Sequence, residues 1–342
     1  MAFTRLLFNK HIITAFLLVQ IWTSLVAGRT LPLVSMLERH EQWMTQHRRS
    51  YKDAAEKAQR LKIFKQNVQF IDSFNAAQNR SYKLAVNNFA DLTNEEFLST
   101  RTGFKMGYSR HNSSSFRYAH VAKIPSSIDW RTKGAVTDVK DQGRCSCCWA
   151  FSAVAAIEGI NQVSRGNLVS LSAQELVDCD TSESRGCHGG FFDSAFEFII
   201  RNKGLSTEAD YPYEGVDGWC NAERDYSSRF GDIRGYENVP ANSESALMKA
   251  VANQPVSVAI DASGYEFKYY TSGVFTGHCG TDLNHAVTVV GYGKTGDGIK
   301  YWVVKNSWGT NWGESGYVRL QRDSGTMGGL CGIAMHASYP IA

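Results

Sequence analysis

The residues best suited to chemistry lie in one run near the middle of the chain, Gln142 to Phe151, with the sequence QGRCSCCWAF. Cys148 stands where this run passes into an apolar, alanine-rich segment. The pattern predicts a buried helix over residues 149–163 that ends near Gly166. A cysteine in the first turn of a helix lies at the positive end of the helix dipole, which favours thiolate over thiol. Because the thiolate is the nucleophilic form, Cys148 is the candidate nucleophile.

A thiolate nucleophile needs an imidazole for proton transfer and an acceptor that orients the imidazole. His285 opens a predicted strand at residues 286–292. Asn306 closes a second predicted strand at residues 301–305. Two neighbouring strands would present both side chains to one cleft. A single histidine or asparagine is more often structural, so the interpretation depends on taking all three residues together.

The hydrophobic pattern indicates the elements that must position these residues. Residues 36–97 are polar and helical in pattern, and residues 99–123 form a loose stretch. From Ile124 onward the chain is rich in glycine and aromatic residues, and this shift predicts a domain boundary. Strands are predicted at residues 255–260, 286–292, 301–305 and 316–320. Helices early and strands late favour an α+β arrangement in two lobes.

One spacing within the first helical region suggests a specific role. Six residues separated by three or four positions share a helix face about 100° wide. They are Glu56, Arg60, Phe64, Asn67, Ile71 and Asn75. This mixed polar and apolar face suits a helix that docks on another surface. Chance spacing in a long amphipathic helix is the alternative.

Composition and charge exclude several classes of protein. The 342 residues are 43% hydrophobic and 20% charged, which excludes a disordered, collagenous or low-complexity chain. Residues 1–123 have a net charge of +10, whereas residues 124–342 have −7. Two such halves should attract each other. The basic residues are scattered, so we expect no nucleic-acid partner.

The first residues are typical of an export signal. Arg5 and Lys10 precede an apolar stretch over residues 12–26, and small residues follow at Ala27 and Gly28. This pattern predicts a cleaved signal peptide over residues 1–27, with a short membrane anchor as the alternative. No later segment is apolar enough to span a membrane.

Export makes the eight cysteines interpretable, since an oxidising compartment favours disulfides. All eight lie after Ile124, and six could form three bridges. The two spare cysteines could both belong to the cluster from Cys145 to Cys148. Zinc is the competing interpretation, but only this cluster has ligand spacing and no second pair accompanies it, so we expect no metal.

Three blocks of the chain resemble the active-site segments of papain-like cysteine proteases. They are Cys145-x-x-Cys148-Trp149, Leu283-Asn284-His285-Ala286 and Lys305-Asn306-Ser307-Trp308-Gly309. His285 lies 137 residues after Cys148 and Asn306 lies 158 after it, close to the family's spacing. The six-residue helix face resembles the family's propeptide helix motif. Asn87-x-Phe89-x-Asp91 resembles a second propeptide motif, and Gly186-Cys187-x-Gly189-Gly190 resembles the substrate-binding glycines.

The resemblance covers nearly everything after the signal and is closest to plant senescence-associated members of the family. It implies a papain-like fold of two lobes, one helical and one barrel-like. It also implies a signal peptide at 1–27, a helical inhibitory propeptide at 28–123 and a peptidase domain at 124–342. The expected function is that of a cysteine endopeptidase made as a self-inhibited zymogen, which degrades proteins without a cofactor.

The resemblance also implies catalytic roles. Cys148 would be the nucleophile, His285 the base and then the acid, and Asn306 the residue that orients the imidazole under the shield of Trp308. The Gln142 side chain and the Cys148 N–H would stabilise the oxyanion.

Binding roles and disulfides follow from the same resemblance. Gly189 and Gly190 would pair with an extended substrate. A second substrate pocket would have apolar walls and select Leu, Val or Phe; its walls would be Phe191, Ala259, Leu283 and Ala286. His336 would form its floor, where it would gain charge in mild acid, accept an acidic side chain and disfavour Arg or Lys; a packed, neutral histidine is the alternative. The implied disulfides are Cys145–Cys187, Cys179–Cys220 and Cys279–Cys331.

Three residues depart from the family pattern. Ser146 replaces a glycine and Cys147 replaces a small residue, both beside the candidate nucleophile. Ser146 could narrow the first substrate pocket or strain the turn, and Cys147 could compete in disulfide formation. Ala85 replaces a glycine in the second propeptide motif and could loosen propeptide docking. None of these changes removes a catalytic group.

Two other classes of protein fit the sequence less well. An inhibitor built on the propeptide module alone would lack the nucleophile or end near residue 123, and neither holds. A thiol–disulfide oxidoreductase using the cluster from Cys145 to Cys148 would leave His285 and Asn306 unexplained.

The resemblance and the signal set the remaining expectations. The partners would be protein and peptide substrates, the chain's own propeptide and cystatin-type inhibitors, and the enzyme would be a monomer free of the membrane once the signal is removed. The route would be secretory, ending in the vacuole or lysosome or outside the cell. Sequons predict glycosylation at Asn79 and Asn112.

Overall fold

The computed structural model describes residues 35–77, 79–105, 116–221 and 229–342. The expected signal peptide and the Asn112 sequon lie outside these residues. The described residues belong to two compact units, one ending at Asp53 and the other beginning at Ala54. Within the described ranges, no helix is both long and apolar enough to cross a membrane.

The first unit contains helix α2 (Met36–Gln46), which starts with a capping box. The Ser35 hydroxyl accepts a hydrogen bond from Glu38 N, and Ser35 N donates to the Glu38 carboxylate. This reciprocal pair satisfies backbone donors that a helix start otherwise leaves free.

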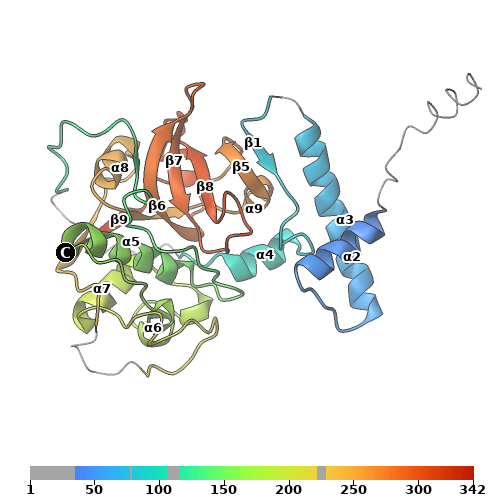
Figure 1. Ribbon diagram of the computed structural model, residues 1–342, viewed down its shortest axis with the longest axis horizontal. Helices are drawn as coiled ribbons and strands as arrows, with labels where there is room; N and C mark the ends of the chain where they lie inside the picture. Colours follow the sequence, from blue (N-terminus) through green and yellow to red (C-terminus); the bar gives the residue numbers. More distant parts are fainter. Residues whose placement is uncertain (1–34, 78, 106–115, 222–228) are drawn as a thin grey trace, which may run out of the picture. The chain divides into compact units, whose positions relative to one another are not determined.

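Most helices of the second unit precede most of its strands (Figure 1). The helices are α3 (Ala54–Ala76), α4 (Asn94–Arg101), α5 (Cys148–Arg165), α6 (Ala173–Cys179), η1 (Gly186–His188), α7 (Phe192–Asn202), α8 (Glu244–Val251), α9 (Tyr265–Lys268) and η3 (Leu330–Gly332). The strands are β1 (Tyr82–Leu84), β2 (Ile128–Asp129), β3 (Gly235–Asn238), β4 (Val256–Ile260), β5 (Tyr270–Phe275), β6 (His285–Lys294), β7 (Lys300–Lys305), β8 (Tyr317–Gln321) and β9 (Ala337–Ile341).

The strands form one nine-stranded sheet in the order β1-β5-β8-β7-β6-β4-β9-β3, with β2 paired to β6. Strands β6 and β7 pair antiparallel. The first residue of β6 therefore lies beside the end of β7, which brings His285 and Asn306 together as predicted. The four predicted strands correspond to β4, β6, β7 and β8 within one or two residues.

Two apolar cores confirm the α+β arrangement in two lobes. One core surrounds the sheet and includes Trp302, Trp308 and Trp312. The other surrounds α5, α6 and α7, which lie together in Figure 1. Helix α5 contacts α6 and α7 and also β4 and β6, so it joins the lobes. The hydrophobic pattern missed β1, β2, β3, β5 and β9, which are short or carry polar residues.

The predicted face of α3 holds the segment that follows it. Asn75 exchanges hydrogen bonds with the backbone of Leu84 in β1, at 2.7 and 3.1 Å. Arg60 pairs with Glu96 of α4 at 2.7 Å. Phe64 and Ile71 on the same face are buried. These residues therefore form a clamp, which we define as the row of side chains along one side of α3 that holds the following segment.

Asn67 lies at the centre of this face and is almost fully buried. Its Nδ2 donates to the carbonyls of Ala90 and Leu92 at 2.8 and 3.2 Å. Its Oδ1 accepts from the hydroxyl of Tyr265 in α9. One carboxamide thus links α3 to the next segment and to the lobe that carries the sheet.

We expect Asn67→Ala to destabilise the full chain by about 2–4 kcal/mol, because two buried carbonyls lose their donor. Chemical denaturation of the full-length protein measures this loss. Gln66→Ala is the matched control, since Gln66 is exposed on the same helix, and it should change stability by less than about 0.5 kcal/mol. Equal effects of the two substitutions would contradict the clamp.

Candidate active site

Cys148 is the first residue of α5, with Cys147 at the N-cap. The alanine-rich sequence of α5 packs against both lobes, and the helix ends at Gly166, whose φ of 71° is left-handed. The Cys148 sulfur is buried and accepts a hydrogen bond from Ala286 N at 3.4 Å. The helix start therefore places the thiol beside the residue that follows His285.

His285 and Asn306 form a hydrogen bond of 2.8 Å between Nε2 and Oδ1. The same Oδ1 accepts from the backbone N–H of Ser307 at 2.8 Å, which fixes the orientation of the carboxamide. A carboxamide oxygen can only accept, so His285 Nε2 carries the hydrogen. In the neutral ring, Nδ1 is then an unprotonated base, and it has no hydrogen-bond partner among the described residues.

Trp308 covers this pair. Its ring stacks on His285 with centroids 4.6 Å apart and planes 23° from parallel. Trp308 is itself fully buried. The indole therefore keeps water from the hydrogen bond between His285 and Asn306.

Burial controls the charges of the two reactive groups. It raises the pKa of the Cys148 thiol to about 12, although backbone donors including Ala286 N act in the opposite direction. It lowers the pKa of His285 to about 4, against the effect of the Asn306 hydrogen bond. Burial in this closed form therefore opposes the thiolate that the helix start favours.

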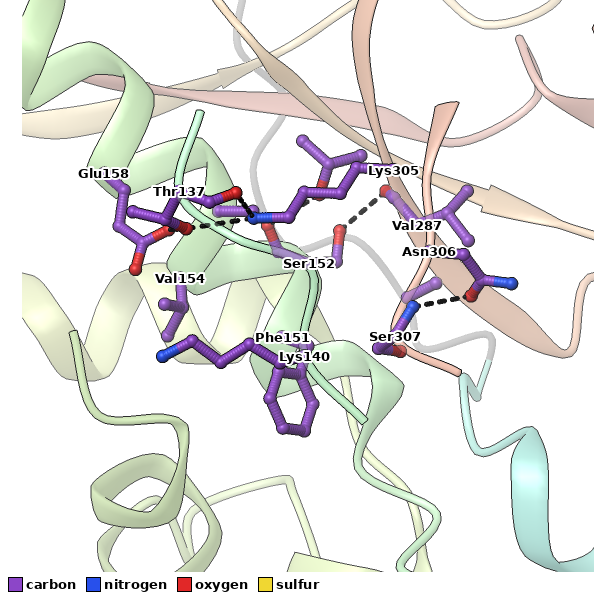
Figure 2. A pocket seen from close by; sticks show the side chains of 13 residues that line it. Thr137, Lys140, Phe151, Ser152, Val154, Glu158, Val287, Lys305, Asn306 and Ser307 are labelled. Atoms are coloured by element: carbon purple, nitrogen blue, oxygen red, sulfur yellow. Dashed lines mark hydrogen bonds between the residues drawn. The ribbon is translucent and has the colours of Figure 1, made fainter. Parts of the chain in front are cut away.

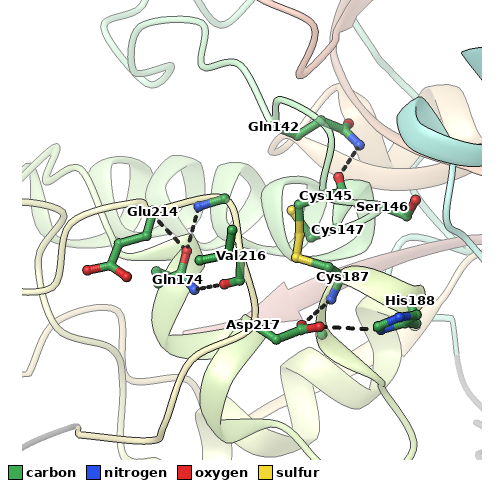
Figure 3. The surroundings of a disulfide bond; sticks show 12 residues. Gln142, Cys145, Ser146, Cys147, Gln174, Cys187, His188, Glu214, Val216 and Asp217 are labelled. Carbon is green, nitrogen blue, oxygen red and sulfur yellow. Dashed lines mark hydrogen bonds and ion pairs between the residues drawn. A yellow bond between two sulfur atoms is a disulfide. The ribbon is translucent and has the colours of Figure 1, made fainter. Parts of the chain in front are cut away.

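Gln142 lies beside the same helix start and is fully buried. Its Nε2 donates to Cys145 O at 2.9 Å (Figure 3). Its Oε1 accepts from the Ser307 hydroxyl at 2.7 Å. The disulfide between Cys145 and Cys187 ties this segment to η1. The other disulfides are Cys179–Cys220 and Cys279–Cys331, so all three are the pairs that the resemblance implies.

Residues 103–105, which precede the expected peptidase domain, run across these groups. Gly103 N and Phe104 N donate to Asn284 O at 2.9 Å each. Gly190 N donates to Gly103 O at 2.9 Å, and Lys105 N donates to Gly190 O at 3.3 Å. The backbone of Gly190, expected to bind substrate, is therefore occupied by the chain's own earlier segment.

The fit at Gly103 is close. A Cβ atom there would lie 1.9 Å from Ser146 O, so only glycine can pass at this point. Gly189 is also held close to this segment, since a Cβ on it would lie 2.6 Å from Gly103 O.

Phe104 inserts its ring among the residues expected to form the second pocket. Its ring lies 6.3 Å from Phe191 and 5.5 Å from His336. Ala259, Leu283 and Ala286 belong to the same apolar cluster as Phe104. The motif positions missed Phe192, which stacks on Phe104 at 5.2 Å. They also missed Asp193, which pairs with His336 Nε2 at 2.9 Å.

A small cavity lies behind Asn306, between α5 and the strands β6 and β7 (Figure 2). Its volume is about 20 Å³, close to that of one water molecule. Lys305 Nζ donates to Thr137 O at 2.8 Å and to Thr137 Oγ1 at 2.9 Å. Thr137 Oγ1 in turn donates to Glu158 of α5 at 2.6 Å. Burial lowers the pKa of Lys305 and raises that of Glu158.

This buried network was missed in the sequence, where Lys305 resembles a surface lysine. It ties the residue before Asn306 to the helix that begins at Cys148. The helix that carries Cys148 and the strand that ends at Asn306 are therefore joined by this network, in addition to the contact between Cys148 and Ala286.

The three departures have simple structural outcomes. Ser146 is not among the described residues with positive φ, so it does not strain its turn. Its hydroxyl donates to Ser99 O at 3.1 Å. Cys147 remains a free, buried thiol that contacts the Tyr213 hydroxyl at 3.0 Å. Ala85 N donates to Tyr269 O at 2.9 Å.

The described residues contain no group of three or more His, Cys, Asp and Glu side chains placed to hold a metal ion. What the arrangement offers is a thiol, an imidazole with a free nitrogen, and a carboxamide. Those groups suit acyl transfer through a cysteine nucleophile.

Comparison with known proteins gives the same class. Residues 40–97 match the cathepsin propeptide inhibitor domain, and residues 124–341 match the family described as papain family cysteine protease. Senescence-specific cysteine protease SAG39 of Oryza sativa subsp. indica is 56% identical over 313 residues, 90% of this chain and 91% of that protein. Senescence-specific cysteine protease SAG12 of Arabidopsis thaliana is 54% identical over 344 residues, 97% of this chain and 99% of that protein.

Solved structures of precursors are similar as well. The recombinant stem bromelain precursor has a TM-score of 0.83 and 47% identity, over 90% of this chain and 98% of that one. The proform of Amb a 11, a cysteine protease and ragweed pollen allergen, has a TM-score of 0.81 and 44% identity, over 90% of this chain and 94% of that one. This chain therefore belongs to the papain family of cysteine proteases.

Proposed function

We propose that the chain is a secreted cysteine endopeptidase zymogen in which Cys148, His285 and Asn306 form the catalytic triad and Gln142 completes the oxyanion hole. The observation that carries this proposal is the hydrogen-bond chain from Ser307 N through Asn306 to His285 Nε2. It leaves His285 Nδ1 free to accept a proton on the side of the ring away from Asn306.

The reaction follows from these groups. Cys148 gives its proton to His285 Nδ1, and the thiolate attacks the substrate carbonyl carbon, moving the C=O electron pair onto oxygen. Gln142 Nε2 and the Cys148 N–H stabilise that oxyanion. The C–N bond then breaks, and the leaving amine takes the proton from Nδ1. Water attacks the thioester with the same help from His285, which frees the acid and restores the thiol.

The parts of the precursor have separate roles in this proposal. Residues 1–27 direct export, residues 28–123 fold and inhibit the enzyme, and residues 124–342 form the peptidase. Processing ends close to Ile124. The route is secretory, to the vacuole or lysosome or to the outside. Asn79, which is exposed in the turn after α3, is a glycosylation site together with Asn112.

The partners are extended protein substrates, the propeptide and cystatin-type inhibitors, and the processed enzyme is a monomer. Phe104 supports an apolar second pocket, because the propeptide already places an aromatic ring there. We therefore assign a preference for Leu, Val or Phe at the second residue before the scissile bond.

We expect Cys148→Ala to abolish peptide hydrolysis and leave the fold intact, since it removes only the nucleophile. Cys147→Ser should retain activity, because that side chain faces Tyr213 and not His285. Peptidase assays and mass mapping of a thiol-directed inhibitor measure both. Modification of Cys147 by the inhibitor, or loss of activity in Cys147→Ser with Cys148 free, would reverse the assignment.

Acid should speed processing, because burial in the closed form opposes the protonation of His285. His285 titrates near 4 when covered and near its ordinary 6.5 when open, so opening takes up a proton between these values. Burial also lowers the pKa of Lys268, which donates to Leu92 O of the propeptide at 2.7 Å, to about 7, so this lysine acts above that pH and His285 alone acts below it. The closed form therefore loses stability as pH falls from 6.5 towards 4.

We expect processing at about pH 4.5 to be at least about tenfold faster than at about pH 7. Time courses with a fixed trace of processed enzyme measure this ratio. Opposite charges also hold the two parts together, because Arg101 pairs with Asp141 at 2.9 Å and Arg117 with Glu237 at 3.7 Å between propeptide and peptidase. Equal rates at both pH values would contradict the account.

His336 should let the second pocket accept an acidic side chain, because its ring can pair with a carboxylate, as it does with Asp193 at 2.9 Å. The ratio of cleavage with Glu to that with Leu should therefore fall about two- to fivefold in His336→Ala. It should rise in Asp193→Asn, because Asp193 competes for the ring. A peptide series varying only this position provides the measurement. An unchanged ratio in both variants would show that His336 does not line the pocket.

A further inference from the structure

The main chain of Gln142 is held from both lobes. Its N–H donates to Ser307 O at 2.8 Å, on the side of the sheet. Its carbonyl accepts from the hydroxyl of Tyr213 at 2.7 Å, on the side of the helical lobe. The other donor to this carbonyl is Cys145 N, at 3.3 Å, which is longer than an ordinary N–H···O hydrogen bond.

The position after Gln142 makes the Tyr213 bond important. Gly143 has a φ of 60°, a Cβ on it would meet nothing within 4 Å, and its N–H donates to the Asp141 carboxylate at 2.9 Å. Arg144 beyond it is exposed. Without the Tyr213 hydroxyl, the carbonyl of Gln142, whose side chain must face the oxyanion, would keep only the longer bond from Cys145 N beside this glycine turn.

Tyr213 is itself held firmly. Its ring packs edge-on against Phe151 of α5, with centroids 4.9 Å apart. Its backbone N–H donates to the Glu208 carboxylate at 3.1 Å. Burial raises the pKa of the hydroxyl, which therefore keeps its single hydrogen.

The Tyr213 hydroxyl has only one hydrogen, and this assigns the donor role to Cys147. The Tyr213 hydroxyl gives its one hydrogen to the Gln142 carbonyl, so towards Cys147 it can only accept. The Cys147 thiol, 3.0 Å away, must be the donor. Burial raises the pKa of Cys147, which keeps it a thiol. Cys147 also lies beside the disulfide of Cys145 without entering it (Figure 3).

We propose that Tyr213, oriented by the thiol of Cys147, is a positioning residue that holds Gln142 for oxyanion stabilisation. The inference rests on the proposed role of Gln142 and extends it to a residue 71 positions away. Tyr213 touches neither substrate nor reacting atoms, and it acts through the Gln142 carbonyl.

The test uses enzyme processed from the full-length zymogen. Tyr213→Phe keeps the ring on Phe151 and removes only the hydroxyl. We expect kcat/KM to fall about fivefold, mainly in kcat, as for loss of one neutral hydrogen bond. Inhibition by a peptide aldehyde, whose adduct carries an oxyanion, should weaken by the same factor. Alkylation of Cys148 by iodoacetamide forms no oxyanion and should keep its rate.

Tyr211→Phe is the matched control. The Tyr211 hydroxyl bonds Asp178 and not Gln142, so its loss should leave all three measurements unchanged. At position 147, serine keeps a donor and should behave like the wild type. Cys147→Ala removes that donor and should reduce kcat/KM and aldehyde affinity together, by a smaller factor than Tyr213→Phe. This second variant tests the inference should Tyr213→Phe fail to fold.

A double-mutant cycle separates the inference from the function on which it rests. Gln142→Ala should lower kcat about a hundredfold, and adding Tyr213→Phe should then cost nothing more. Additive losses, an unchanged aldehyde affinity in Tyr213→Phe, or an equal loss in alkylation would each overturn the role of Tyr213 alone. Full activity of Gln142→Ala would instead overturn the role of Gln142, and that of Tyr213 with it.

Discussion

The carboxamide of Asn306 can take only one orientation, and much of the site depends on it. Ser307 N points at its oxygen, so that oxygen also faces His285 and places the imidazole hydrogen on Nε2. The antiparallel pairing of β6 and β7 brings the two side chains within reach. Behind them, Lys305 and Thr137 fasten the same corner to α5, so the thiol and the imidazole are held by one rigid body.

The propeptide segment inhibits through hydrogen bonding and burial. The propeptide segment fills the hydrogen bonds of Gly190 and Asn284 that an extended chain would use, and it removes water from the cleft. Without water, both reactive groups lose their charges, since burial penalises thiolate and imidazolium alike. Under the proposed roles, the closed enzyme is inactive because its cleft is filled and because burial disfavours the thiolate of Cys148.

Much of this arrangement could be predicted from local patterns, and some could not. Strand ends at His285 and Asn306 follow from β-branched runs, and the start of α5 follows from its alanine-rich sequence. The contacts of Lys305, Asp193 and Tyr213 do not, because each joins segments far apart in the chain. A lysine, an aspartate or a tyrosine has no local pattern that distinguishes a buried tie from an exposed side chain. Departures from a family pattern were the better signal, since Cys147 led to Tyr213 and Ser146 to a bond with the propeptide.

Strand β1 completes the sheet at the side of β5, and it belongs to the matched propeptide domain, which we propose is removed by processing. Its three residues pair with Gly273, Ser272 and Tyr270. The proposed cleavage near Ile124 would turn β5 into an edge strand, with backbone donors and acceptors open to another chain. In the precursor, β1 covers this edge, so strand pairing between copies is blocked there. The short length of β1 keeps the newly opened edge small in the processed enzyme.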